Sequence, residues 1–133
     1  MSAKAEFGKP SSEQKTFVRI LSRACSVETC YPPIADRWTE ENPFYGHCAV
    51  IAELVRRNFG GKIAKSRVTL ADKEKVLHYW NLLDDGSEWD VSDSQFKDNP
   101  IVEYGPIIVK DAVTSSETRK RVRILRTRLA ELL

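Results

Sequence analysis

The sequence is poor in the features that mark specialised classes of protein. Its formal net charge is only +2, which is too small to indicate a polyanionic partner such as a nucleic acid. It has no internal repeat, no low-complexity segment and no apolar run of membrane-spanning length. Residues 1–15 are polar and do not resemble a signal peptide. Its three cysteines fit no common disulfide framework, so we expect a reduced, cytoplasmic protein without membrane association.

What the sequence does contain is typical of an ordinary globular domain. Hydrophobic residues make up 41% and charged residues 30% of the 133 residues, a balance that argues against a disordered chain. A chain of this length supports one hydrophobic core. We therefore expect a flexible tail over residues 1–11 and a single domain over residues 12–133.

Two helices are predicted in the first half of the chain. Ser11 and Gln14 have the spacing of a capping box, which predicts a helix that ends near Arg23. The second helix begins at Cys48 and is apolar along most of its length. A glycine pair at residues 60–61 then supplies the left-handed conformation that closes many helices.

A third helix is predicted to run to the C-terminus. Thr114 and Glu117 have the spacing of a second capping box. Basic residues are frequent between positions 119 and 128, and we interpret them as a solvated face because no aromatic residue interleaves with them to stack on bases. On a helical wheel one apolar stripe is formed by Val122, Leu125, Leu129 and Leu132.

A small antiparallel sheet is predicted between these helices. Residues 62–70, 76–83 and 87–92 have the composition of strands, and residues 107–109 that of an edge strand. The turn Asp84-Asp85-Gly86 joins two of them as a hairpin. The fold class is therefore α+β, with helices packed on a small antiparallel sheet.

Residues 25–45 are predicted to form a long ordered loop. The segment is too rich in proline for regular structure, yet it carries several aromatic residues that indicate packing. Long ordered loops in small domains are more often functional than decorative. Trp38 and Tyr45 are therefore candidates for lining a cleft, although packing of the loop explains them equally well.

The chemistry of the chain points to a cysteine nucleophile. A thiol in the first turn of a helix, as predicted for Cys48, faces unpaired N–H groups that stabilise a thiolate. His78 lies in a predicted strand and Asp90 in the strand paired with it. These are the residue types that a thiol needs as base and as orienting partner. Asp93 competes with Asp90 for the third role, but strand alternation favours Asp90.

Short sequences around these residues resemble two groups of proteins. Gly46-His47-Cys48, His78-Tyr79-Trp80-Asn81 and Trp89-Asp90-Val91-Ser92 are similar to the core of papain-fold enzymes of the transglutaminase-like group. A closer resemblance, over residues 24–96, is to the small bacterial YunG-like proteins. It rests on Thr29-Cys30-Tyr31-Pro32-Pro33, Trp38, Asn42-Pro43, Gly46-x-Cys48 and Ser94-Gln95-Phe96.

The resemblance implies a compact papain/transglutaminase-like fold and a role for each site residue. Cys48 would be the nucleophile, His78 the general base and acid, and Asp90 the residue that orients the imidazole. Asn42 stands where papain-like enzymes carry the glutamine that binds the oxyanion, one methylene shorter. His47, before the cysteine, would place a second titrating group beside the thiol.

These features predict a cysteine hydrolase or acyltransferase that forms a thioester with a peptide, protein or small amide substrate and needs no cofactor. An alternative from another class is a non-catalytic binding module that keeps the fold. A zinc site built from Cys25, Cys30 and either Cys48 or a histidine is disfavoured, because four residues separate the first two cysteines and no second pair follows.

Overall fold

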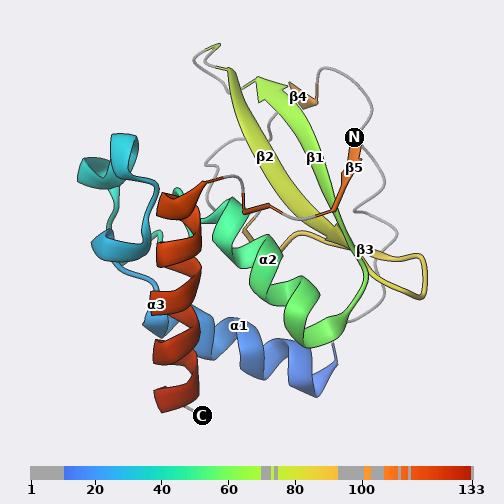
Figure 1. The fold of residues 1–133 in the computed structure, drawn as a ribbon, viewed down its shortest axis with the longest axis horizontal. Helices are drawn as coiled ribbons and strands as arrows, with labels where there is room; N and C mark the ends of the chain where they lie inside the picture. The colour runs from blue at the N-terminus through green and yellow to red at the C-terminus, as the bar shows by residue number, and fades with distance from the viewer. Residues whose placement is uncertain are drawn as a thin grey trace.

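The computed structural model describes residues 11–69, 73, 75–92, 101–102, 107–110, 112–113 and 115–132. Within these ranges three α-helices and two short 3-10 helices accompany a five-stranded antiparallel sheet (Figure 1). The α+β fold class is therefore confirmed. The predicted tail lies almost wholly outside the described residues.

The elements follow one another as α1 (Ser12–Ala24), η2 (Val27–Thr29), η3 (Pro32–Arg37), α2 (Cys48–Phe59), β1 (Lys62–Thr69), β2 (Lys75–Leu82), β3 (Glu88–Trp89), β4 (Ile101–Val102), β5 (Ile107–Val109) and α3 (Ser116–Leu132). The strand order is β3-β2-β1-β4, and β5 also pairs with β1.

Hydroxyl side chains cap the first and last helices. At α1 the Ser11 hydroxyl accepts the N–H of Gln14 at 3.1 Å, and the Gln14 side chain accepts the N–H of Ser11 at 2.8 Å, which confirms the predicted capping box. At α3 the hydroxyl of Ser115 accepts the N–H of Thr118 at 3.1 Å. The cap thus lies one residue after the predicted Thr114, which is outside the described residues.

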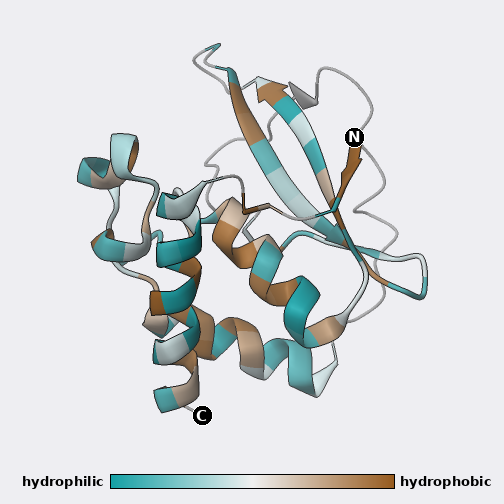
Figure 2. Ribbon diagram, in the orientation of Figure 1, coloured by the Kyte–Doolittle hydropathy of each residue, from teal (hydrophilic) through white to brown (hydrophobic). Residues whose placement is uncertain are grey.

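Helix α2 lies at the centre of the fold, with helices on one side and the sheet on the other (Figure 1). Its residues 50–55 are all buried. The Asn81 side-chain amide of β2 donates a 3.0 Å hydrogen bond to the Ala52 carbonyl, so α2 is tied to the sheet by a polar contact as well as by packing. The ribbon coloured by hydropathy shows hydrophobic and hydrophilic stretches alternating along the three helices (Figure 2).

The stripe predicted on α3 is correct for three of its four residues. Val122, Leu125 and Leu129 are buried against α1 and α2. Leu132 is 46% exposed, so the buried part of the stripe ends at Leu129. Leu132 lies in the last turn of the helix, beyond the elements that cover the others.

The hairpin at residues 84–86 forms as predicted, but its second strand is shorter. The N–H of Leu83 bonds to the carbonyl of Ser87 at 2.8 Å, and β3 ends at Trp89 instead of continuing to Ser92. Asp90 therefore follows the strand and is not part of it. The two-residue strand β4 was not predicted at all, because so short a segment carries no alternation.

The start of α2 is packed tightly against the preceding loop. Gly46 adopts a φ of +71°, which favours glycine. The space beside its Cα is crowded, since a Cβ added there would lie 2.4 Å from the Sγ of Cys30. The Gly46 carbonyl accepts the N–H of Tyr31 at 3.0 Å, which joins the two ends of the loop.

We expect Gly46→Ala to lower the free energy of unfolding by roughly 2 to 5 kcal/mol, because backbone strain and the clash with Cys30 add. Gly86→Ala is the matched control, with a φ of +88° and open space around the added Cβ. It should cost only about 1 to 2 kcal/mol. Urea unfolding of both variants measures the difference, and equal losses would show that the contact with Cys30 does not constrain the loop.

Candidate functional site

Cys48 is the first residue of α2 and is partly exposed. Its Sγ lies 3.9 Å from the carbonyl oxygen of Leu77, the residue before His78 in β2. The helix N-terminus contributes a partial positive charge and N–H groups without acceptors inside the helix. The predicted position of the cysteine in the first helical turn is therefore confirmed.

His78 and Asp90 form a buried pair beside this thiol. His78 Nε2 lies 2.6 Å from Asp90 Oδ2, and both side chains are at least 98% buried. The Ser92 hydroxyl donates a longer, 3.4 Å hydrogen bond to Asp90 Oδ1. On the other side the ring of Trp80 stacks on the imidazole with centroids 5.7 Å apart. The ring of His78 is thus fixed, with Nε2 directed at the carboxylate.

The surroundings of His78 favour its charged form. Burial alone would lower its pKa, but hydrogen bonds with Asp90 and with Cys48, and the negative charges of these two groups, raise the pKa to about 9. The carboxylate and the thiol therefore act on the same imidazole. The structure brings together Cys48, His78 and Asp90, while Asp93 lies outside the described residues.

The other two cysteines are in different surroundings. Cys25 and Cys30 are both buried. Burial raises the pKa of each thiol, to about 11 for Cys30 and further for Cys25. Both thiols therefore stay protonated and covered at neutral pH. Among the described residues no group of three or more histidine, cysteine or acidic side chains is arranged to hold a metal ion.

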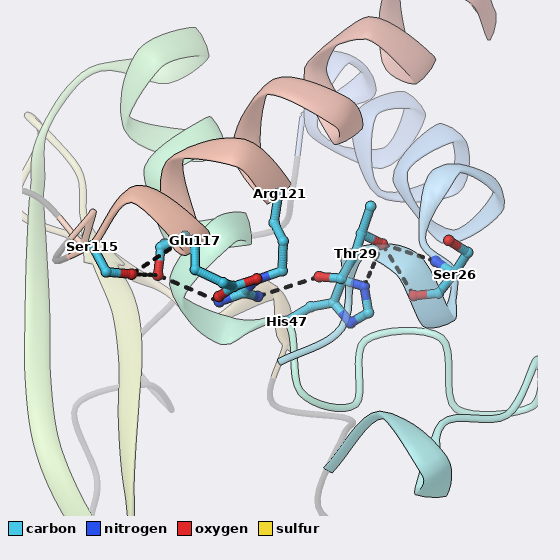
Figure 3. Close-up of polar contacts among 7 residues, drawn as sticks. Ser26, Thr29, His47, Ser115, Glu117 and Arg121 are labelled. Carbon is cyan, nitrogen blue, oxygen red and sulfur yellow. Dashed lines mark hydrogen bonds and ion pairs between the residues drawn. The ribbon is translucent and has the colours of Figure 1, made fainter. Parts of the chain in front are cut away.

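His47, the residue before Cys48, points into the protein and is fully buried. Its Nδ1 lies 2.7 Å from the carbonyl oxygen of Tyr45 and must donate, because a carbonyl only accepts. Its Nε2 lies 2.7 Å from the hydroxyl of Thr29, which donates to the neutral ring (Figure 3). The ring therefore fastens the start of α2 to η2 and does not line a cleft.

Arg121 of α3 completes this buried polar cluster (Figure 3). Its guanidinium donates to the Thr29 carbonyl at 3.3 Å and to Glu117 at 2.8 Å. Burial lowers the pKa of His47 to about 4, and the charge of Arg121 lowers it further. The hydrogen bond that His47 donates to the Tyr45 carbonyl acts in the opposite direction. His47 is thus neutral at pH 7, in contrast to His78, whose pKa is raised.

The interpretation of the α3 basic residues as a solvated face was wrong for two of them. Arg121 is only 4% exposed, and Arg128 bonds to the Ala24 carbonyl and the Ser26 hydroxyl. The helical wheel contained the signal, because position 121 lies four residues before Leu125 on the apolar stripe. Thr29, also fully buried, had no such signal, because it lies in an irregular loop.

The remaining cleft candidates belong to the loop before α2. Trp38 Nε1 donates to the Pro43 carbonyl at 2.9 Å, which holds the indole on its own loop. Backbone bonds of Asn42 to Thr39 and Tyr45 close a turn. Tyr45 is half-buried, and its carbonyl accepts from both His47 and Cys30. The described contacts thus show that these residues shape the loop. That they also contact a substrate stays a prediction.

Fold and site together define an α+β protein with one accessible thiol beside a buried His–Asp pair. A family model described as "YunG protein" matches residues 13–133, and the chain belongs to this family. The "Uncharacterized protein YunG" of Bacillus subtilis (strain 168) is 35% identical over 63 residues, which are 47% of this chain and 50% of that relative. The match therefore spans about half the length of the relative.

The resemblance to YunG-like proteins is confirmed by these matches. No solved structure matches the chain, so the likeness to the papain/transglutaminase-like group stays a prediction. Within the described ranges no helix has the length and apolar character needed to cross a membrane.

The opposite pKa shifts of the two histidines predict that the folded protein is most stable near pH 6.5, the ordinary pKa of a histidine in an unfolded chain. Because the pKa of His78 is raised to about 9, its stabilisation is complete below pH 6.5 and is lost as the pH rises through 9. Because the pKa of His47 is lowered to about 4, the unfolded chain alone gains a proton below pH 6.5, and stability falls towards acid. Each loss is on the order of 3 kcal/mol.

Urea unfolding between pH 4 and pH 9 measures this profile. Compared with the parent, His78→Asn should show a smaller loss of unfolding free energy as the pH rises above 6.5. His47→Asn should show a smaller loss as the pH falls below 6.5. Asn at position 47 keeps a donor near the Tyr45 carbonyl and does not titrate. A profile with the same slopes in the parent and both variants would contradict these electrostatic assignments.

Proposed function

We propose that this protein is a cysteine-dependent hydrolase or acyltransferase in which Cys48 attacks an amide or other acyl carbon. The observation that supports it is the convergence of three elements on one point. The start of α2 presents the thiol, β2 presents His78, and the turn after β3 presents Asp90 at 2.6 Å from the imidazole. A buried imidazole whose pKa is raised by both a carboxylate and a thiol is suited to holding the thiol proton.

The proposed reaction starts from a thiolate on Cys48 and an imidazolium on His78. The sulfur attacks the acyl carbon, a C–S bond forms, and the carbonyl electron pair moves to oxygen. When the pair returns, the C–N bond breaks and the amine leaves with the Nδ1 proton of His78. Water or an amine then attacks the thioester and gives its proton to His78, and the thiolate leaves with the C–S electron pair.

The surroundings would assist each step. Asp90 keeps Nε2 protonated and so keeps Nδ1 directed at the thiol. Backbone N–H groups in the first turn of α2 are the proposed donors to the oxyanion, and the helix dipole favours negative charge there. Asn42 precedes this turn by six residues. In this proposal it contributes by shaping the loop and, in the bound state, as a second donor.

The chain order of the three groups also supports membership of the papain/transglutaminase-like group, which we propose as the wider relationship. In the transglutaminase-like pattern a helix carries the cysteine, a following strand the histidine, and the next strand the aspartate. Here Asp90 directly follows its strand, one position beyond Trp89. The substrate within the amide and acyl class is set by the surface around Cys48.

We expect iodoacetamide to alkylate Cys48 faster than the other two cysteines in the folded protein. His78→Ala and Asp90→Asn should both remove most of this advantage, because each breaks the proton-holding pair. Mass spectrometry of peptides alkylated between about pH 4 and pH 10 measures the rates. Cys25 and Cys30 are internal controls, since both are buried and should stay unmodified in the folded protein.

The outcome separates the enzyme from a binding module on the same fold. A binding module has no need for a reactive thiol, so Cys48 would alkylate with the pH profile of a free cysteine in all three proteins. Once a substrate is found, Cys48→Ala should abolish turnover while the urea midpoint stays nearly unchanged. Equal turnover in that variant would contradict the assignment.

A further inference from the structure

One face of the sheet is covered by α2 over only part of its length. Residues paired across antiparallel strands point to the same face, and β1 pairs Ile63 with Asn81, Lys65 with Tyr79 and Arg67 with Leu77. Asn81 bonds to α2, so all these side chains lie on the face that the helix covers. Ile63 and Asn81 are 0% and 1% exposed.

The helix begins at Cys48, and the sheet extends past that point (Figure 1). The side chains of this face are exposed there: Leu77 is 47% exposed, and Ile107 of β5, paired with Lys65, is 55% exposed. Strand β5 is hydrophobic throughout (Figure 2). Exposed apolar side chains on a strand next to a reactive group are typical of a binding surface.

The thiol lies at the boundary between the covered and the open part. Its Sγ is 3.9 Å from the Leu77 carbonyl, and Cys48 packs against the cluster that contains Tyr79. The Lys65 ammonium lies over the Tyr79 ring, 5.9 Å from its centroid. An acyl group bound at Cys48 therefore has the open face beside it. We call this open part of the face the sheet platform and define it by Lys65, Arg67, Leu77 and Ile107.

We propose that the sheet platform binds the substrate of the proposed reaction, and that this substrate is a peptide segment carrying both acidic and apolar side chains. That the bound peptide is a substrate rests on the proposed function. Two cations, Lys65 and Arg67, match carboxylates, and Leu77 and Ile107 match apolar side chains. A nucleic acid would meet the cations but leave the exposed apolar side chains against a charged backbone.

The test uses the full chain with Cys48→Ala, so that binding is measured without chemistry. A fluorescein-labelled ten-residue peptide of alternating Glu and Leu is titrated, and anisotropy gives its affinity; a Lys/Leu peptide and a single-stranded oligonucleotide of similar length are the comparisons. We expect the Glu/Leu peptide to bind best, and binding to weaken at least about tenfold in Lys65→Glu/Arg67→Glu. The preference of the protein for the Glu/Leu peptide over the Lys/Leu peptide should vanish near 1 M salt, where charges are screened within about 3 Å.

The matched control is Arg123→Glu/Arg126→Glu, which makes the same change of net charge on exposed positions of α3. Equal losses in both variants, or equal binding of the two peptides, would overturn the proposal, as would preference for the oligonucleotide. If Lys65→Glu/Arg67→Glu does not fold, the milder Lys65→Gln/Arg67→Gln replaces it. The comparison of the peptides on the Cys48→Ala protein, whose sheet is unchanged, also tests the proposal.

A second measurement separates this proposal from the proposed function. Iodoacetate is anionic and iodoacetamide neutral, so their rate ratio at Cys48 reports positive charge near the thiol. The ratio should fall several-fold in Lys65→Glu/Arg67→Glu and not in the α3 control, while the iodoacetamide rate itself reports the His78 pair. A slow iodoacetamide rate with intact peptide binding would contradict the proposed cysteine chemistry and support the sheet platform as a peptide-binding surface. A fast rate with no preference between the peptides would support the chemistry and contradict the sheet platform.

Discussion

The first turn of α2 is held by buried polar contacts on two sides, and the site depends on this constraint. On one side the ring of His47 bonds to Thr29 and to the Tyr45 carbonyl. Four residues into the helix, the amide of Asn81 bonds to the carbonyl of Ala52. Buried hydrogen bonds of this kind are costly to break because the freed groups have no water to replace their partners. The helix therefore cannot slide along β2, and the distance from its first residue to Leu77 and His78 is fixed.

The two histidines have opposite pKa shifts because their neighbours differ. Both are buried, and burial lowers the pKa of each. His47 meets carbonyl and hydroxyl oxygens and the charge of Arg121, so it stays neutral. His78 meets a carboxylate and a thiol, whose charges outweigh burial. In the proposed reaction a single proton is therefore held beside Cys48, by the imidazole of His78.

How much of this could be predicted from the sequence depended on local signals. Capping residues at Ser11, the glycines after Phe59 and the Asp-Gly turn marked helices and a hairpin that the structure confirms. The order of Cys48, His78 and Asp90 alone was weak evidence for a site, and the resemblance of the short sequences around them to known proteins strengthened it. The cluster around His47 was not predicted, because its members lie in three separate segments and meet only through tertiary packing.

The most direct test of the account is an NMR titration of the His78 imidazole nitrogens in the parent, Cys48→Ala and Asp90→Asn. The chain has only two histidines, so the assignment needs one further variant at His47. The account predicts a midpoint near pH 9 in the parent, with lower midpoints in both variants because each loses one group that raises the pKa. A parent midpoint at or below the ordinary value of about 6.5, unmoved by either substitution, would contradict it.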